Sequence, residues 1–174
     1  MVSLALYTVF IGATALERIV EMVVSRRNLA WSLERGGVEY GFSHFPVMVA
    51  LHTGFLAGCV LEPWYLERPL YPLLAAICFV AALACQALRW WCINTLGPQW
   101  NTRVVIVPGL PRVTSGPYRW MNHPNYVAVV VEGVVLPMIH SAWVTALVFT
   151  VCNALLLTVR IRVENKALAE ISSR

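Results

Sequence analysis

Long apolar stretches separated by short polar segments dominate the chain. Five of them are long enough, or nearly so, to cross a bilayer as a helix, which takes about 20 residues. They cover residues 2–24, 43–61, 71–92, 125–139 and 142–161. The fourth is short and carries Gly133 and Pro137, so we expect a tilted or broken helix there. This pattern predicts an all-α, polytopic membrane bundle of about five transmembrane helices.

The composition supports an integral, multi-pass membrane protein. Of the 174 residues, 59% are hydrophobic and 13% are charged, whereas a soluble domain is about a quarter charged. We expect a single domain over residues 1–174, with three helices in 1–92 and a cofactor-binding loop, helical hairpin and tail in 93–174. Arginines gather at the ends of apolar segments instead of forming a basic stripe, so no nucleic-acid partner is expected.

The basic residues orient the bundle, because cytoplasmic loops carry an excess of Lys and Arg. With five crossings, one side receives Arg26, Arg27, Arg35, Arg103, Arg112, Arg119, Arg160, Arg162, Lys166 and Arg174. The opposite loops hold Arg68, offset by Glu62 and Glu67. We therefore predict an external N-terminus and a cytoplasmic C-terminus. The candidate site residues then gather at the cytoplasmic face, where water-soluble cofactors are available.

Three polar residues share one face of the last apolar segment. At about 100° per residue, Arg160 and Glu164 fall within roughly 20° of Asn153, whereas Arg162 points to the opposite side. We interpret this face as part of a binding site. The alternative is an i, i+4 ion pair between Arg160 and Glu164 at a helix end, which is worth about 0.2–0.5 kcal/mol.

A polar turn precedes the fourth apolar segment. Asn122 is predicted to be the N-cap of this helix, and Pro124 suits its first turn. His123 and Tyr126 then lie together at the helix start, where free N–H groups favour an anion such as the carboxylate of an amino-acid-like cofactor. The alternative is an interfacial His123 bonded to a neighbouring carbonyl.

Glu132 lies about two turns below His123, roughly 13 Å into the membrane. A carboxylate at this depth needs a partner or a proton, and Asn153, Arg89 and Arg160 are the candidate partners. A polar clamp between helices and a catalytic role both remain open for it.

Other polar residues within the apolar segments are expected to have structural or peripheral roles. Glu17, Arg18 and Glu21 are predicted to anchor the bundle. His44 and His52 are placed to touch a substrate, but their i, i+8 spacing does not make a metal site. We predict no metal.

The polar motifs resemble a known family. Gly116-Pro117-Tyr118, His123-Pro124-Asn125-Tyr126 and Arg160-Ile161 with Glu164 are similar, over about residues 96–170, to the isoprenylcysteine carboxyl methyltransferase family. These are small integral membrane enzymes that use S-adenosylmethionine. The N-terminal half resembles a bacterial branch that O-methylates alkylated polyketides such as alkylpyrones and alkylresorcinols. That likeness rests on Glu17-Arg18, Ser25-Arg26-Arg27-Asn28, Gly36-Gly37-Val38-Glu39-Tyr40-Gly41 and His44-Phe45-Pro46.

The resemblance implies roles for individual residues. Glu164 would contact the cofactor and Arg160 would face the methyl acceptor. Apart from the resemblance, we expect Glu132 and Asn153 as further acceptor contacts. The implied cofactor-binding residues are Leu110, Pro111, Arg112, Val113, Tyr118, His123, Pro124, Asn125, Tyr126 and Glu164. Asn122 stands where the family usually has Arg, and Asn165 where a second Glu is usual, so Glu164 alone would carry the acidic role.

The favoured function is an S-adenosylmethionine-dependent O-methyltransferase that acts on a lipophilic, membrane-embedded acceptor. The acceptor is either a pyrone or resorcinol hydroxyl of an alkylated polyketide or an isoprenylcysteine-type carboxylate. A carboxylate or enolate needs no base, whereas a phenol, with a pKa of about 10, does, and His123 or Glu132 would then supply it. The alternatives are an NADPH-dependent sterol- or steroid-type reductase, with Arg103, Arg112 and Arg119 on the 2′-phosphate, and a non-enzymatic scaffold or transporter.

Overall fold

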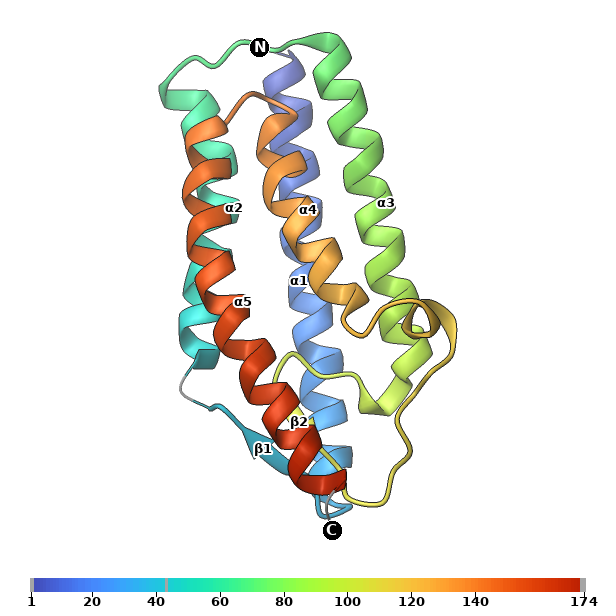
Figure 1. Cartoon of the computed structure of the whole chain (residues 1–174). Helices are drawn as coiled ribbons and strands as arrows, with labels where there is room; N and C mark the ends of the chain where they lie inside the picture. Colours follow the sequence, from blue (N-terminus) through green and yellow to red (C-terminus); the bar gives the residue numbers. More distant parts are fainter. Residues whose placement is uncertain (1, 43, 173–174) are drawn as a thin grey trace.

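The computed structural model describes residues 2–42 and 44–172, most of which belong to α-helices. The helices are α1 (Val2–Leu33), α2 (His44–Tyr65), α3 (Pro72–Leu96), α4 (Pro124–Met138) and α5 (Trp143–Ser172). In the described residues, four of them are long and apolar enough to span a membrane, while α4 has only 15 residues. The helices run alternately up and down (Figure 1). The predicted all-α membrane bundle is confirmed.

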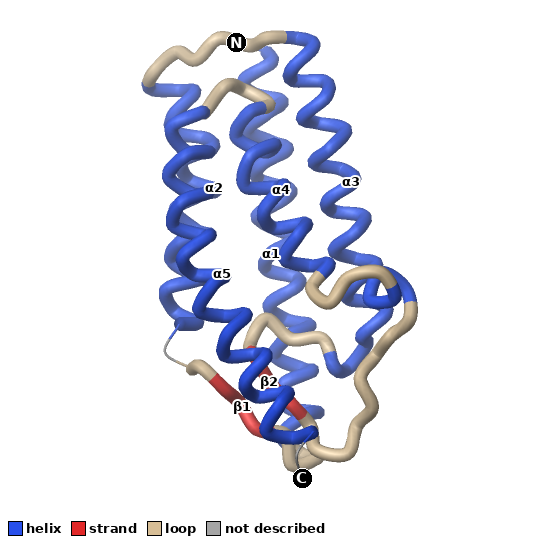
Figure 2. The backbone as a smooth tube through the Cα atoms, in the orientation of Figure 1, coloured by secondary structure: helices blue, strands red, loops and turns tan. Residues whose placement is uncertain are grey.

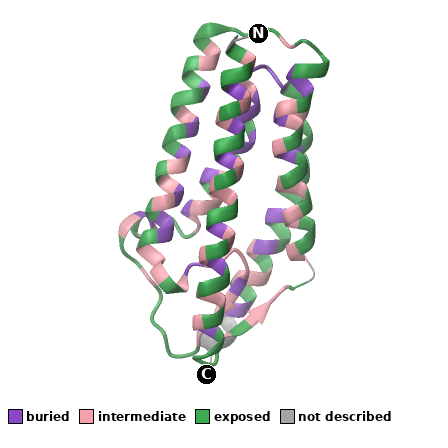
Figure 3. Ribbon diagram, turned by 180° about the vertical axis from the view of Figure 1, so that it is seen from behind, coloured by how far each residue is buried: buried purple, intermediate pink, exposed green. Residues whose placement is uncertain are grey.

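The outward faces of the helices are largely exposed (Figure 3), and they carry many large apolar side chains. Val9, Leu73 and Leu155 are 70%, 77% and 69% exposed. Apolar side chains on such a surface require lipid as their solvent, because patches of this extent are rare on soluble proteins. The chain is therefore an integral, multi-pass membrane protein.

The connections divide between the two ends of the bundle (Figure 1). The N-terminus, the α2–α3 loop and the α4–α5 turn lie at one end. The C-terminus, the α1–α2 connection and the loop between α3 and α4 lie at the other. This loop, residues 97–123, is called the link below. The arginine-rich segments thus share one end, as the charge pattern predicts. That this end faces the cytoplasm stays a prediction of the positive-inside rule.

Helix α1 continues past the expected boundary at residue 24 to Leu33. The polar side chains of this extension hydrogen-bond to the link. Asn28 donates through Nδ2 to the carbonyl oxygens of Trp100 at 2.7 Å and Gly97 at 3.1 Å. Ser25 accepts a 3.0 Å hydrogen bond at Oγ from the amide N–H of Thr102. The polar residues extend the helix because the link satisfies their hydrogen-bonding groups.

The link from α3 to α4 contains structure that the sequence did not predict. It begins with a short 3₁₀ helix, η1 (Gly97–Gln99), continues into strand β2 (Val104–Ile106) and later forms a second 3₁₀ helix, η2 (Gly116–Arg119). Strand β2 pairs antiparallel with β1 (Val38–Tyr40), which lies between α1 and α2 (Figure 2). Three-residue strands are too short to show alternating hydrophobicity, so they leave no readable pattern.

Helix α4 is continuous, so the break considered at Gly133 and Pro137 does not occur. Pro137 lies in the last turn. Gly133 provides room for the ring of Phe149 on α5, because a Cβ at position 133 would stand 2.6 Å from two ring carbons. The small residue thus allows close packing between α4 and α5.

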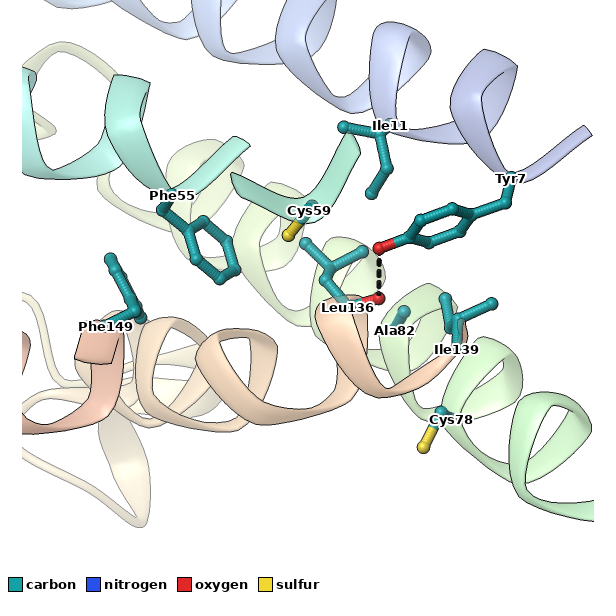
Figure 4. Packing of buried hydrophobic residues seen from close by; sticks show 9 residues of the cluster. All are labelled: Tyr7, Ile11, Phe55, Cys59, Cys78, Ala82, Leu136, Ile139 and Phe149. Carbon is teal, nitrogen blue, oxygen red and sulfur yellow. Dashed lines mark hydrogen bonds between the residues drawn. The ribbon is translucent and has the colours of Figure 1, made fainter. Parts of the chain in front are cut away.

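A hydrophobic cluster fills the end of the bundle nearest the N-terminus. Its members are Tyr7, Ile11, Phe55, Cys59, Cys78, Ala82, Leu136, Ile139 and Phe149 (Figure 4). The Tyr7 hydroxyl donates a 3.1 Å hydrogen bond to the Leu136 carbonyl, and the rings of Phe55 and Phe149 lie 4.1 Å apart between centroids. This cluster holds the helices together at the end of the bundle opposite the link.

A buried charge cluster joins α1, α3 and α4 in mid-bundle. Arg89 donates from Nε and Nη2 to Glu21 at 3.1 and 2.5 Å. Arg18 contacts Glu21 at 2.8 Å and Glu132 at 3.3 Å. Arg89 lies 3.6 Å from Glu132. The anchoring role expected for the charged residues of the first helix is confirmed. Of the partners expected for Glu132, Arg89 is the one that lies beside it.

Candidate active site

A large cavity of about 970 Å³ opens inside the bundle among the described residues. All five helices and the link contribute to its wall. Along α1 it extends from Thr8 to Ser32, about 36 Å at 1.5 Å per residue. One part is lined by hydrocarbon side chains such as Ile11, Leu56 and Val60, and the part beside the link also presents polar side chains such as Asn101, Arg112 and His123. The cavity therefore joins an apolar channel to a polar chamber.

Glu164 and Tyr126 meet in the polar chamber. The Tyr126 hydroxyl donates a 2.7 Å hydrogen bond to Glu164 Oε2. The Nδ1 atom of His123 lies 3.6 Å from Glu164 Oε1, and the His123 and Tyr126 rings stack with centroids 5.2 Å apart. The first turn of α4 and the middle of α5 thus form one wall with an acidic group, an imidazole and an aromatic face.

Arg160 is the buried cation of this wall, with an exposed fraction of 6%. It donates from Nη2 to the carbonyl of Thr102 at 2.8 Å, and Nη1 contacts the sulfur of Met48. Its guanidinium carbon lies 5.7 Å from the centre of the Tyr126 ring. Among the described residues no ion pair joins Arg160 to Glu164, and both side chains contact Tyr126 instead. The helix-surface pair considered for them does not form.

The link supplies the other side of the chamber. Leu110, Pro111, Arg112, Val113 and Tyr118 all line the cavity, and their contact with the cofactor stays a prediction. Burial raises the pKa of Tyr118 above its ordinary value, with the Cys92 thiol beside it. The Tyr118 hydroxyl therefore stays protonated near neutral pH.

The start of α4 differs from the expectation in one detail. His123, and not Asn122, is the residue that precedes the helix, and Pro124 is its first residue. Asn122 instead accepts a 3.0 Å hydrogen bond from Arg112. The shift by one residue follows from Pro124, whose ring disfavours a helical conformation only at the residue before it. Asn122 thus binds the link to the helix start.

Two residues of the expected site do not line the cavity. Pro124 is fully buried and shapes the helix start. Glu132 pairs with Arg18 and Arg89 behind the wall, and neither Asn153 nor Arg160 reaches it. Of the two roles considered for Glu132, these contacts support the polar clamp between helices. Asn153 lines the cavity, and its contact with the acceptor stays a prediction.

Several cavity residues carried no clear signal in the sequence. Met48 and Thr102 hold Arg160, and Arg18 and Arg89 reach the cavity from the charge cluster. The helical period of a sequence shows which residues share one face of a helix, but not which segment packs against that face. Contacts between the helices and the link could therefore not be predicted from the sequence. Among the described residues, no group of three His, Cys, Asp or Glu side chains is placed to hold a metal ion.

Comparison with known proteins identifies the family. The model of the isoprenylcysteine carboxyl methyltransferase (ICMT) family matches residues 75–170. This range is more than half of the chain, and it includes Tyr126, Arg160 and Glu164. The chain belongs to the ICMT family. The match extends into α3, beyond the 96–170 range that the motifs indicate.

Two bacterial relatives are similar to the chain over nearly its whole length. The uncharacterized protein YpbQ of Bacillus subtilis is 36% identical over 167 residues, which cover 96% of this chain and 99% of the relative. An uncharacterized protein of Haemophilus influenzae is 23% identical over 155 residues, 88% of this chain and 90% of the relative. Membership of the ICMT family implies a methyltransferase that uses S-adenosylmethionine.

The residues of the polar chamber fit that cofactor. Glu164 offers a carboxylate for a cationic group, and Tyr126 offers an aromatic face, which favours cations as well. The Asn125 side chain oxygen is buried at the cavity without a hydrogen-bond partner among the described residues. It can accept a hydrogen bond from an ammonium or amino group. The chamber therefore provides acidic, aromatic and hydrogen-bonding partners for a charged, nitrogen-rich ligand.

Proposed function

We propose that the protein is an O-methyltransferase that transfers the methyl group of S-adenosylmethionine to a lipophilic acceptor held within the membrane. One observation carries this proposal. The Tyr126–Glu164 pair and Arg160 face the same cavity, and that cavity continues into a channel lined by hydrocarbon. A water-soluble donor and a lipid-tailed acceptor can therefore meet beside one pair of functional groups.

The polar chamber is the donor side of the proposed site. Glu164, Tyr126, His123 and Asn125 would hold the amino-acid and sulfonium parts of S-adenosylmethionine. The link residues 110–113 and Tyr118 would cover the rest. When bound, the cofactor supplies an activated methyl group, so the task of the protein is to hold the two reactants in line.

Arg160 marks the acceptor side. Its guanidinium is buried between Met48, Thr102 and the Tyr126 ring, on the wall of the cavity. A fixed cation at this position would orient an acceptor oxygen and stabilise its negative charge. The alkyl chain of the acceptor would lie along the channel beside Ile11 and Leu56, which is long enough for an extended lipid tail.

The acceptor class follows from this channel and from the resemblance of the N-terminal half. An alkylated polyketide with a pyrone or resorcinol hydroxyl, or an isoprenylcysteine-type carboxylate, has a polar reacting group on a long apolar tail. Both match a chamber that opens into hydrocarbon. The arginine excess at the same end of the bundle supports a site at the cytoplasmic face, where the donor is made.

Ligand-induced thermal stabilisation of the purified protein in detergent tests the proposal. S-adenosylhomocysteine should raise the melting temperature, and NADPH should not. Glu164→Gln should reduce the shift, while Arg162→Ala, on the opposite face of α5, should leave it unchanged. Stabilisation by NADPH alone would favour the reductase and contradict the proposal.

A further inference from the structure

His52 presents a hydrogen-bond acceptor to the cavity. This half-buried residue of α2 lines the cavity, and its Nδ1 atom lies 2.9 Å from the carbonyl oxygen of Met48. A carbonyl oxygen only accepts, so Nδ1 carries the hydrogen of this bond. In a neutral imidazole the other nitrogen, Nε2, then keeps its lone pair. The backbone of α2 thus selects the tautomer whose Nε2 can accept a proton.

Asn153 presents a second polar group at the same level. The His52 ring packs edge-on against Phe149, with centroids 5.2 Å apart and an interplanar angle of 85°. Phe149 lies one turn before Asn153 on α5, so the two residues share a face. Asn153 is 2% exposed, lines the cavity, and its side chain oxygen has no hydrogen-bond partner among the described residues.

These two residues lie between Arg160 and the hydrocarbon part of the cavity. The side chain of Met48, one turn before His52, contacts Arg160. Beyond His52 on α2, the cavity is lined by Leu56 and Val60. A head group whose tail occupies the channel would therefore pass His52 and Asn153 before it reaches Arg160.

We propose that His52 and Asn153 bind the polar head of the acceptor, and that His52 takes the proton of a hydroxyl group as that hydroxyl is methylated. This inference rests on the proposed function. In the step, the acceptor oxygen forms a bond to the methyl carbon while the bond from that carbon to sulfur breaks. The electron pair of the broken bond stays on sulfur, which becomes a neutral thioether, and the hydroxyl proton moves to His52 Nε2.

The arrangement selects a neutral hydroxyl over a carboxylate. An ionised carboxylate brings no proton, so it gains nothing from a proton acceptor. A phenol has a pKa of about 10, and at neutral pH it reacts only when a base removes its proton. His52 supplies that base, and Arg160 stabilises the developing oxyanion. The acceptor class that this site fits is a long-chain phenol.

Acceptor binding tests the inference without any donor. The probe is 5-pentadecylresorcinol, and its dimethyl ether is the control ligand that cannot donate a hydrogen bond. Binding is followed by tryptophan fluorescence of the protein in detergent. His52→Ala should weaken resorcinol binding about tenfold and leave ether binding unchanged. His44→Ala is the matched control, because His44 begins the same helix and does not line the cavity.

The pH dependence of methyl transfer separates a base from a structural residue. His52→Gln keeps a hydrogen-bond acceptor but cannot take the proton. At pH 7 its single-turnover rate should be about 10²–10⁴ times lower than that of the wild type. The rate should then rise about tenfold per pH unit toward the pKa of the phenol, because the ionised phenol needs no base.

Unchanged resorcinol binding in His52→Ala, or a wild-type rate at pH 7 in His52→Gln, would overturn the inference. A rate loss that alkaline pH does not restore would do so as well, because it would indicate a structural role. These outcomes leave the proposed function intact if the wild type binds S-adenosylhomocysteine. Absence of that binding would instead refute the proposed function.

Discussion

The hydroxyl of Tyr126 lies 2.7 Å from Oε2 of Glu164, a hydrogen bond that ties the first turn of α4 to the middle of α5. The two residues are 38 positions apart in the chain. The carboxylate lies on the cavity wall beside His123. The contact joins the two helices of the hairpin at the candidate site.

Glu164→Gln should weaken S-adenosylhomocysteine binding about ten- to a hundredfold, because the substitution removes a charge-assisted hydrogen bond while it preserves shape. Tyr126→Phe should weaken it less, by about threefold to tenfold, because only the bond that orients the carboxylate is lost. Isothermal titration in detergent measures both affinities. Equal affinity in wild type and Glu164→Gln would place the cofactor elsewhere.

Arg160→Lys should lower kcat about ten- to a hundredfold and change S-adenosylhomocysteine affinity little. Lysine keeps the charge but lacks the planar fork that reaches Thr102 and the acceptor together. Methyl transfer to 5-pentadecylresorcinol provides the rate. Arg162→Lys serves as the control, because Arg162 is exposed on the opposite face of α5. A similar loss in both variants would argue against a role for Arg160 at the acceptor.

Arg89→Ala should destabilise the fold by about 3–5 kcal/mol, because it leaves two buried carboxylates, Glu21 and Glu132, short of a cation. Arg35→Ala is the control, because the ion pair between Arg35 and Glu34 is exposed. This substitution should change the free energy of unfolding by less than about 1 kcal/mol. Unfolding of the protein in mixed micelles by increasing SDS reports both values. Equal effects would mean that the charge cluster contributes no more than a surface pair.

Gly133→Ala should destabilise the α4–α5 hairpin by about 1–3 kcal/mol, because the added methyl group meets the Phe149 ring at 2.6 Å. Gly54→Ala is the matched control on α2, where a Cβ meets nothing within 4 Å. It should leave stability unchanged or raise it by up to about 1 kcal/mol. Thermal unfolding in detergent distinguishes the two. If Gly133→Ala were as stable as the wild type, α4 and α5 could move apart with no loss of stability.

Asn122→Cys should resist a membrane-impermeant maleimide in intact cells, and Glu67→Cys should react. The two positions lie at opposite ends of the bundle, and the arginine excess assigns Asn122 to the cytoplasm. Both variants require a background in which Cys152, the exposed native thiol, is replaced by Ala. Labelling of Asn122→Cys without permeabilisation would reverse the predicted orientation.

Much of the fold was readable because a membrane imposes simple constraints on sequence. Each spanning helix needs a long apolar run, so the five segments were visible as blocks of hydrophobic residues. The boundaries were less accurate. Helix α1 continues to Leu33 because Ser25 and Asn28 bond to the link, and no local pattern announces a distant partner. The pairing of β1 with β2 was missed for the same reason.

The sequence by itself determined the helical bundle, the shared face of Asn153, Arg160 and Glu164, and the family motifs, because periodicity and local spacing are properties of one segment. The tertiary structure decided which segments meet. It placed Glu132 with Arg18 and Arg89 instead of at the cavity, placed His52 on the cavity wall, and set Arg160 against Thr102. Such contacts depend on how the helices pack and on the path of the link. Neither of these produces a periodic pattern in the sequence.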